Sequence, residues 1–176
     1  ALTSVRELAN EIVVVDTGSA DGSPEIARRH GARVIAAPWE DDFAAARNIS
    51  LEAATGDWIL VLDADEEIDY LNAARLERAI FLAPPAARGF LLTVVSQAEH
   101  PGSGVEVLSR GARLFRNRLG IRFAGELHEQ PVIDGRPLGS ELRPLEVAIY
   151  HFGYADPLKN QTRAARNLGI LRRAAA

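Results

Sequence analysis

A short, uninterrupted apolar run that ends on two acidic residues is the feature that most constrains this chain. Residues 58–62 read Trp-Ile-Leu-Val-Leu, and Asp63, Ala64 and Asp65 follow directly. Five apolar residues without polar alternation are typical of a strand that is buried on both faces, as in a parallel sheet. Ligands of open α/β sheets bind beyond the carboxyl ends of the strands, so Asp63 and Asp65 stand where a ligand would lie.

A second apolar run repeats this arrangement earlier in the chain. Residues 11–16 read Glu-Ile-Val-Val-Val-Asp, so a predicted buried strand again ends on a carboxylate, that of Asp16. Residues 18–22 contain two glycines and predict a turn, and Ser23 followed by Pro24 is a helix-start signature. The segment therefore predicts a strand, a turn and a helix in succession.

Predicted strands and helices continue to alternate as far as Ser96. The patterns predict strands over 33–37 and 89–96, a helix over 43–54 capped by Asp41 or Asp42, and a helix over 70–82. This alternation predicts the α/β class, with a mostly parallel sheet in three layers and helices on both faces.

After Ser96 the pattern changes to short apolar runs without intervening helices. The runs cover 105–109, 112–115 and 121–123, and they predict antiparallel hairpins. Asp134-Gly135 is typical of a hairpin turn, and a final strand over 147–152 precedes a helix that Asp156 would cap and that reaches 171 or beyond.

Composition excludes several classes of function. The 176 residues are enough for about one domain. The net charge of −4 makes nucleic acid an unexpected partner, because no cationic field is available to hold its backbone. The chain has no cysteine, which excludes disulfides, thiolate metal sites and a cysteine nucleophile. No apolar run approaches the roughly 18–20 residues of a membrane span.

The Asp63-x-Asp65 pair offers carboxylate oxygens that could bind Mg²⁺ or Mn²⁺. Phosphates and water would complete the coordination, so the expected ligand is phosphorylated. Two other interpretations stay open. The two residues could form Asx turns that start the following loop. Alternatively, Asp63 could attack phosphorus as in aspartyl-phosphate phosphatases, although the only lysine, Lys159, lies far along the chain. The P-loop and dinucleotide fingerprints are absent.

Six blocks of the chain resemble one known family. They include Phe-Ala-Ala-Ala-Arg-Asn at 43–48, Gly-Glu-Leu-His-Glu-Gln at 125–130 and Tyr-His-Phe-Gly-Tyr at 150–154, together with residues 11–23, 56–66 and 113–117. Along the chain the blocks occur in the same order as in the family 2 glycosyltransferases, which they closely resemble. The resemblance is to the bacterial branch that is often joined to tetratricopeptide repeats. The resemblance implies the glycosyltransferase A fold, a nucleotide-sugar donor and Mn²⁺ or Mg²⁺.

The resemblance also assigns ligand contacts to individual residues. Asp16, Arg47 and Asp63 are similar to residues that contact the donor nucleotide. Asp16 corresponds to an acid that contacts the uracil or ribose, and Asp63 to the member of the Asp-x-Asp pair that contacts the ribose. Asp65 resembles the metal ligand, and His151 the late histidine that reaches the metal or the diphosphate. Without the resemblance, Arg47 would be interpreted as part of the polar face of its helix, and His151 as a packed core histidine.

The expected reaction is metal-dependent, inverting transfer of a sugar, with uridine diphosphate as the expected carrier, to an acceptor hydroxyl. In this resemblance Glu129 is the general base, and the neighbouring His128 is the next candidate. A glycan, a lipid-linked molecule or a protein could be the acceptor. A module that has lost turnover and only presents a surface is the alternative function.

The resemblance further predicts a domain organisation and a location. Residues 1–154 would form the catalytic domain without the family's first strand, with only the tail of the first helix left over 2–8, and residues 155–176 would form a C-terminal helix. The expected location is the cytoplasm or the inner face of the membrane.

Overall fold

The computed structural model describes residues 1–97, 106–153 and 157–174. In chain order the elements are α1 (Leu2–Val5), β1 (Val13–Asp16), α2 (Ser23–Arg29), β2 (Arg33–Ala36), α3 (Phe43–Ala53), β3 (Trp58–Leu60), β4 (Glu66–Glu67), α4 (Tyr70–Leu82), β5 (Gly89–Gln97), β6 (Glu106–Arg116), β7 (Arg122–Ala124), β8 (Gln130–Ile133), β9 (Arg136–Pro137), the 3₁₀ helix η1 (Leu138–Glu141), β10 (Arg143–His151) and α5 (Pro157–Ala174).

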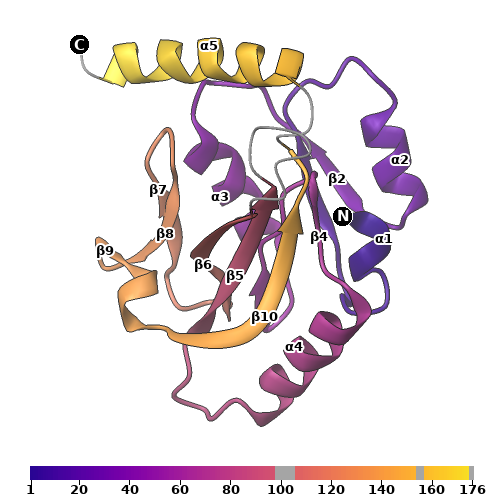
Figure 1. The fold of residues 1–176 in the computed structure, drawn as a ribbon, viewed down its shortest axis with the longest axis vertical. Helices are drawn as coiled ribbons and strands as arrows, with labels where there is room; N and C mark the ends of the chain where they lie inside the picture. Colours follow the sequence, from indigo (N-terminus) through magenta and orange to yellow (C-terminus); the bar gives the residue numbers. More distant parts are fainter. Residues whose placement is uncertain (98–105, 154–156, 175–176) are drawn as a thin grey trace.

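The largest sheet has the strand order β3-β6-β5-β10-β4 (Figure 1 shows β6, β5, β10 and β4). β10 runs parallel to β5, whereas β6 is antiparallel to both β3 and β5, and β4 is antiparallel to β10. The predicted α/β class is confirmed. The pairing inside this sheet is mixed rather than mostly parallel, because β6 returns between β3 and β5. Since β3, β5 and β10 still point the same way, their carboxyl ends lie at one edge of the sheet.

β6 is a single strand of eleven residues where the apolar pattern predicts two short runs. The predicted break falls on Arg110 and Gly111, which nevertheless pair with Thr93 and Leu92 of β5. Strands pair through backbone hydrogen bonds, which do not require apolar side chains. A strand can therefore continue through residues at which the apolar pattern stops.

Two smaller sheets complete the described strands. β1 and β2 form a parallel pair joined by α2, as the strand-turn-helix pattern predicts. β7, β8 and β9 form an antiparallel sheet, with the turn between β8 and β9 at Asp134 and Gly135. Both turn residues have positive φ, 49° and 73°, which is the conformation of a type I′ hairpin turn.

Side-chain caps fix the start of two helices. α3 begins after Asp42, whose carboxylate accepts from the amide of Ala45 at 2.9 Å. α4 begins after Asp69, which accepts from Asn72 in the same way at 2.8 Å, and it covers the predicted 70–82. Each bond satisfies one of the free amides at a helix N-terminus. The predicted cap of α5, Asp156, lies outside the described residues.

The core has two parts on opposite faces of the large sheet. Leu114 of β6 packs with Leu76 of α4, whereas the next residue, Phe115, packs with Ala44 of α3 and with the β7–β9 region. Successive residues of a strand point to opposite faces, so α4 covers one face and α3 the other, as the three-layer prediction requires. Within the described part of the chain, no helix is long and apolar enough to cross a bilayer.

Candidate active site

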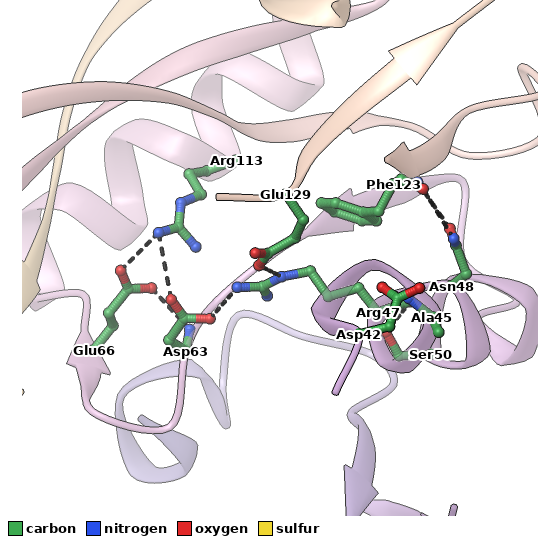
Figure 2. A network of polar contacts seen from close by, with 10 residues as sticks. All are labelled: Asp42, Ala45, Arg47, Asn48, Ser50, Asp63, Glu66, Arg113, Phe123 and Glu129. Carbon is green, nitrogen blue, oxygen red and sulfur yellow. Dashed lines mark hydrogen bonds and ion pairs between the residues drawn. The ribbon is translucent and has the colours of Figure 1, made fainter. Parts of the chain in front are cut away.

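Asp63 is held at three points in the loop after β3 (Figure 2). Its amide donates to Glu66 Oε2 at 2.8 Å, Arg47 Nη2 donates to Oδ1 at 2.7 Å, and Arg113 Nη2 lies 3.5 Å from Oδ2. Its side chain is 33% exposed. Asp63 is therefore a fixed carboxylate that still reaches solvent.

Arg47 joins this loop to the segment before β8. Its Nε donates to Glu129 Oε1 while its Nη2 contacts Asp63, so one guanidinium bridges two carboxylates that lie far apart in sequence (Figure 2). The guanidinium also lies 5.6 Å from the centre of the Phe123 ring. The predicted contact of Arg47 with a nucleotide is thus accompanied by an internal role as the bridge between Asp63 and Glu129.

Asn48 explains why α3 can present Arg47 at this position. Its side-chain amide donates to the carbonyl of Phe123 at 3.0 Å and its carbonyl accepts from the amide of Phe123 at 2.8 Å. The paired bonds join α3 to the edge of β7, so the helix cannot rotate without breaking both. In the Arg-Asn dipeptide of the sequence block, Asn48 therefore bonds the helix to β7 and Arg47 bridges the two carboxylates.

The bridging contacts shift the pKa values of both Asp63 and Arg47. Burial alone would raise the pKa of Asp63, but the nearby guanidinium groups of Arg47 and Arg113 outweigh it and hold that pKa below its ordinary value. Burial likewise acts to lower the pKa of Arg47, and the carboxylates of Asp63 and Glu129 reverse this and raise it. The network thus favours charged groups in a partly buried site.

Glu66 and Arg113 were not predicted as site residues. Glu66 is 1% exposed, accepts from Arg113 Nη2 at 2.9 Å, and has a pKa that burial raises above its ordinary value despite the attraction of Arg113. A signal was present in the spacing Asp63-x-x-Glu66. A Glu three residues after an Asp can reach back to that residue's amide, as in a capping box, and here it does so.

Asp65 and His151 form a second cluster beside the first. Asp65 Oδ2 lies 3.4 Å from His151 Nε2, and the amide of Phe152 donates to the carbonyl of Asp65 at 2.9 Å. His151 Nδ1 lies 3.3 Å from Ser96 Oγ, and its side chain is 14% exposed. His151 is therefore packed and hydrogen-bonded, as the core interpretation expected, but against the predicted metal ligand.

Gly153 closes over this pair. A Cβ built on Gly153 would lie 2.1 Å from Asp65 Oδ2 and 2.6 Å from His151 Nε2, distances that real Cβ atoms do not show. Only glycine therefore lets the chain after β10 approach the carboxylate and the imidazole so closely. The glycine of the Tyr-His-Phe-Gly-Tyr block thus has a steric reason.

The pair fits a divalent cation that takes two ligands from the protein. A carboxylate oxygen and an imidazole nitrogen are donors that Mn²⁺ accepts, and Mg²⁺ commonly binds through one or two carboxylates with waters and phosphates. Among the described residues there is no group of three or more histidine, aspartate and glutamate side chains that could hold a metal. A metal here would need oxygens from the ligand.

The described contacts of the Asp16 carboxylate lie within its own loop. Asp16 ends β1, and its carboxylate accepts from the amide of Ser19 at 3.3 Å, in a loop that is exposed. Hydrogen bonds from Ser19 hold its pKa below the ordinary value, although desolvation acts in the opposite direction. In the described part of the chain, Asp16 takes no part in the contacts that join the other predicted site residues. Its predicted role in nucleotide binding remains a prediction.

Comparisons with known proteins bear on this site. The family described as "Glycosyl transferase family 2" matches residues 1–80. A TPR repeat-containing protein of Synechococcus elongatus is 42% identical over 175 residues, which cover 94% of this chain and 41% of that protein. The SPbeta prophage-derived glycosyltransferase SunS of Bacillus subtilis strain 168 is 29% identical over 173 residues, covering 96% of this chain and 40% of that protein. The predicted resemblance to glycosyltransferase family 2 is confirmed.

The family 2 match over residues 1–80 includes Asp16, Arg47, Asp63, Asp65 and Glu66, whereas Arg113, Glu129 and His151 lie after it. The chain spans about two fifths of the length of the curated relatives it matches. Among solved structures, that of S. aureus TarS 1–349 in complex with UDP-GlcNAc is similar with a TM-score of 0.47 and 16% identity, over 86% of this chain and 53% of that chain.

The site geometry disfavours the phosphatase interpretation. A nucleophilic aspartate needs an electron-rich carboxylate, whereas Arg47 and Arg113 contact the two oxygens of Asp63 and lower its pKa. These two arginines stabilise the carboxylate where it stands and reduce its nucleophilicity.

Proposed function

We propose that this chain transfers a sugar from a nucleotide-diphosphate sugar, with uridine as the expected nucleoside, to the hydroxyl of an acceptor. The observation that carries the proposal is the Arg47 bridge, which brings Glu129 beside Asp63. We call residues 61–65, between β3 and β4, the acidic loop. The Glu129 carboxylate, which could take a proton, thus lies next to the loop where a donor would bind. The match to family 2 glycosyltransferases supports the same reaction class.

The donor would bind along the carboxyl ends of the strands. In this proposal Asp63 contacts the ribose, Asp16 contacts the nucleoside, and Asp65 with His151 holds Mn²⁺ or Mg²⁺. When bound, the cation would act as a Lewis acid that neutralises the charge developing on the departing diphosphate. Arg47 supplies a fixed positive charge at the same edge of the site.

Glu129 would act as the general base. Its Oε1 accepts from Arg47, so Oε2 is the oxygen that would accept the proton of the acceptor hydroxyl. As the acceptor oxygen forms its bond to the anomeric carbon, the bond from that carbon to the phosphate oxygen breaks and the nucleoside diphosphate leaves. General-base assistance of this kind contributes about 10²–10⁴-fold. A single displacement of this geometry inverts the anomeric centre.

The catalytic unit in this proposal comprises residues 1–154, and α5 rests on it through contacts near the start of α3. Arg173 pairs with Asp41 at 2.7 Å, and Arg166 lies over the ring of Phe43, 4.9 Å from its centre.

The experiment compares Glu129→Gln with wild type in the release of uridine diphosphate from UDP-glucose and UDP-N-acetylglucosamine in the presence of Mn²⁺. Glu126→Gln is the matched control, because Glu126 is an exposed acid of the same loop. We expect Glu129→Gln to bind uridine diphosphate normally and to lose at least about 10²-fold in turnover. Turnover that survives in Glu129→Gln would contradict the base assignment. Binding without turnover in wild type would instead favour a binding module.

A further inference from the structure

Side chains from three elements contact Asp63 in the loop after β3. Three elements contribute: α3 through Arg47, β6 through Arg113, and the start of β4 through Glu66. Arg47 belongs to the bridge already described. Arg113 and Glu66 contact Asp63 from the other side, and the proposed reaction has so far given them no role.

Arg113 and Glu66 meet Asp63 through a single shared geometry. Nη2 of Arg113 lies 2.9 Å from Glu66 Oε1 and 3.5 Å from Asp63 Oδ2, while Glu66 Oε2 accepts from the amide of Asp63 (Figure 2). The carbonyl of Asp63 in turn accepts from the amide of Glu66 at 3.0 Å. Main chain and side chain of Asp63 are thus both fixed by the same two residues.

Burial shows why this arrangement is specific. Glu66 is 1% exposed and the side chain of Arg113 is 19% exposed, so an unpaired charge at either position would be costly. Glu66 uses one oxygen for Arg113 and the other for the Asp63 amide. Glutamine has one acceptor oxygen and would turn an N–H group toward one of these donors.

We propose that Arg113 and Glu66 are positioning residues that hold Asp63 in the orientation required for the donor nucleotide. We call this pair the Asp63 clamp. Arg113 lies between two carboxylates, so without it Asp63 would keep Arg47 as a partner but would face the Glu66 carboxylate directly. The clamp acts through Asp63 and needs no contact with the donor. This inference rests on the proposed function only for the identity of the ligand.

The test uses Arg113→Met, Arg113→Lys and the control Arg116→Met in the whole chain. Arg116 lies on the same strand, but it contacts the Trp58 ring, with its guanidinium carbon 4.6 Å from the ring centre, and it donates to the carbonyl of Ala87. Its loss should lower stability without touching Asp63. Arg113→Lys keeps a positive charge with several donors and should restore part of the effect.

Two readouts are compared: hydrogen exchange of the amides of residues 63–66, and the dissociation constant for uridine diphosphate with Mn²⁺ measured by calorimetry. We expect Arg113→Met to speed exchange at Asp63 and to weaken nucleotide binding about 10–100-fold, by analogy with the loss of residues that orient metal ligands. We expect Arg113→Lys to fall between Arg113→Met and wild type. Arg116→Met should change neither readout.

The outcomes separate this inference from the proposed function. Unchanged exchange at Asp63 in Arg113→Met would overturn the clamp whatever the nucleotide result. Faster exchange with unchanged affinity would overturn its role in donor binding. If wild type fails to bind uridine diphosphate, the proposed function fails, and the exchange data alone decide whether the clamp exists. Should Arg113→Met not fold, the same comparison between Arg113→Lys and wild type decides.

Discussion

The Arg47→Met variant removes a cation that contacts both Asp63 and Glu129 while keeping most of the volume of the side chain. Glu129 then loses its one described ion pair, and Asp63 retains Arg113 at 3.5 Å. The side chains of Arg47 and Glu129 are 23% and 10% exposed, so the contact is neither a surface pair nor a fully buried one. The cost of breaking it should lie between those two limits.

Surface ion pairs contribute about 0–1 kcal/mol, and breaking a buried pair by removing one partner costs about 3–5 kcal/mol. The partial exposure and the remaining contact of Asp63 place the expected loss for Arg47→Met near 2 kcal/mol, or roughly 4–8 °C in Tm for a chain of this size. Arg122→Met is the control. Its ion pair with Glu52 has side chains 54% and 60% exposed, so its loss should cost at most about 1 kcal/mol.

A double-mutant cycle with Glu129→Gln isolates the contact. Chemical denaturation of wild type, Arg47→Met, Glu129→Gln and the double variant should give a coupling free energy of about 1–3 kcal/mol. A coupling near zero, or a loss in Arg47→Met no larger than that in Arg122→Met, would refute the interpretation of Arg47 as the bridge of the site.

Three further predictions follow from individual positions. Gly153→Ala should leave the fold intact and abolish binding of Mn²⁺-uridine diphosphate, because its Cβ would displace the carboxylate oxygen of Asp65 that lies 2.1 Å away; unchanged affinity in calorimetry would contradict this. Gly89→Ala should lower the free energy of unfolding by about 1–3 kcal/mol, because its Cβ would lie 2.4 Å from the backbone carbonyl oxygen of Leu114, which cannot move aside. A denaturation midpoint equal to that of wild type would contradict this. Asp63 has a lowered pKa in the folded chain, so its contribution to stability is present above its unfolded pKa of about 4 and is lost as the pH falls through the lower folded value. The stability difference between wild type and Asp63→Asn should therefore shrink on acidification below about pH 4, and a difference independent of pH would argue against a charged Asp63.

The sequence was informative where local chemistry decides the structure. α4 begins and ends at the predicted residues because Asp69 caps its first turn and Pro84 follows its last. The turn at Asp134 and Gly135 was predictable because few residue pairs adopt two successive positive φ angles.

Long-range pairing was not predictable in the same way. The position of β6 between β3 and β5 depends on contacts between segments far apart in the chain, which periodicity does not describe. The same reason explains the site residues that were missed. Arg113 stands within the apolar run predicted over 112–115, and it reaches Glu66 and Asp63 only because β6 runs beside β3 in the sheet.

The resemblance gave Arg47, Asp63 and Glu129 separate roles and did not predict that they contact one another. Each was assigned to a ligand, and the structure adds that they also contact one another. Asp16 shows the opposite outcome, since its position at the end of β1 follows the prediction but the described contacts do not join it to the others.

The central claim is that the acidic loop after β3 binds a nucleoside diphosphate together with a divalent cation. Calorimetric titration of wild type and Asp65→Ala with uridine diphosphate, each with and without Mn²⁺, tests it most directly. We predict that Mn²⁺ strengthens binding to wild type, and that Asp65→Ala loses this dependence while unfolding at nearly the same temperature, because Asp65 is 39% exposed and lies outside the core. Equal affinity with and without Mn²⁺ in wild type, or an unchanged dependence in Asp65→Ala, would contradict the claim.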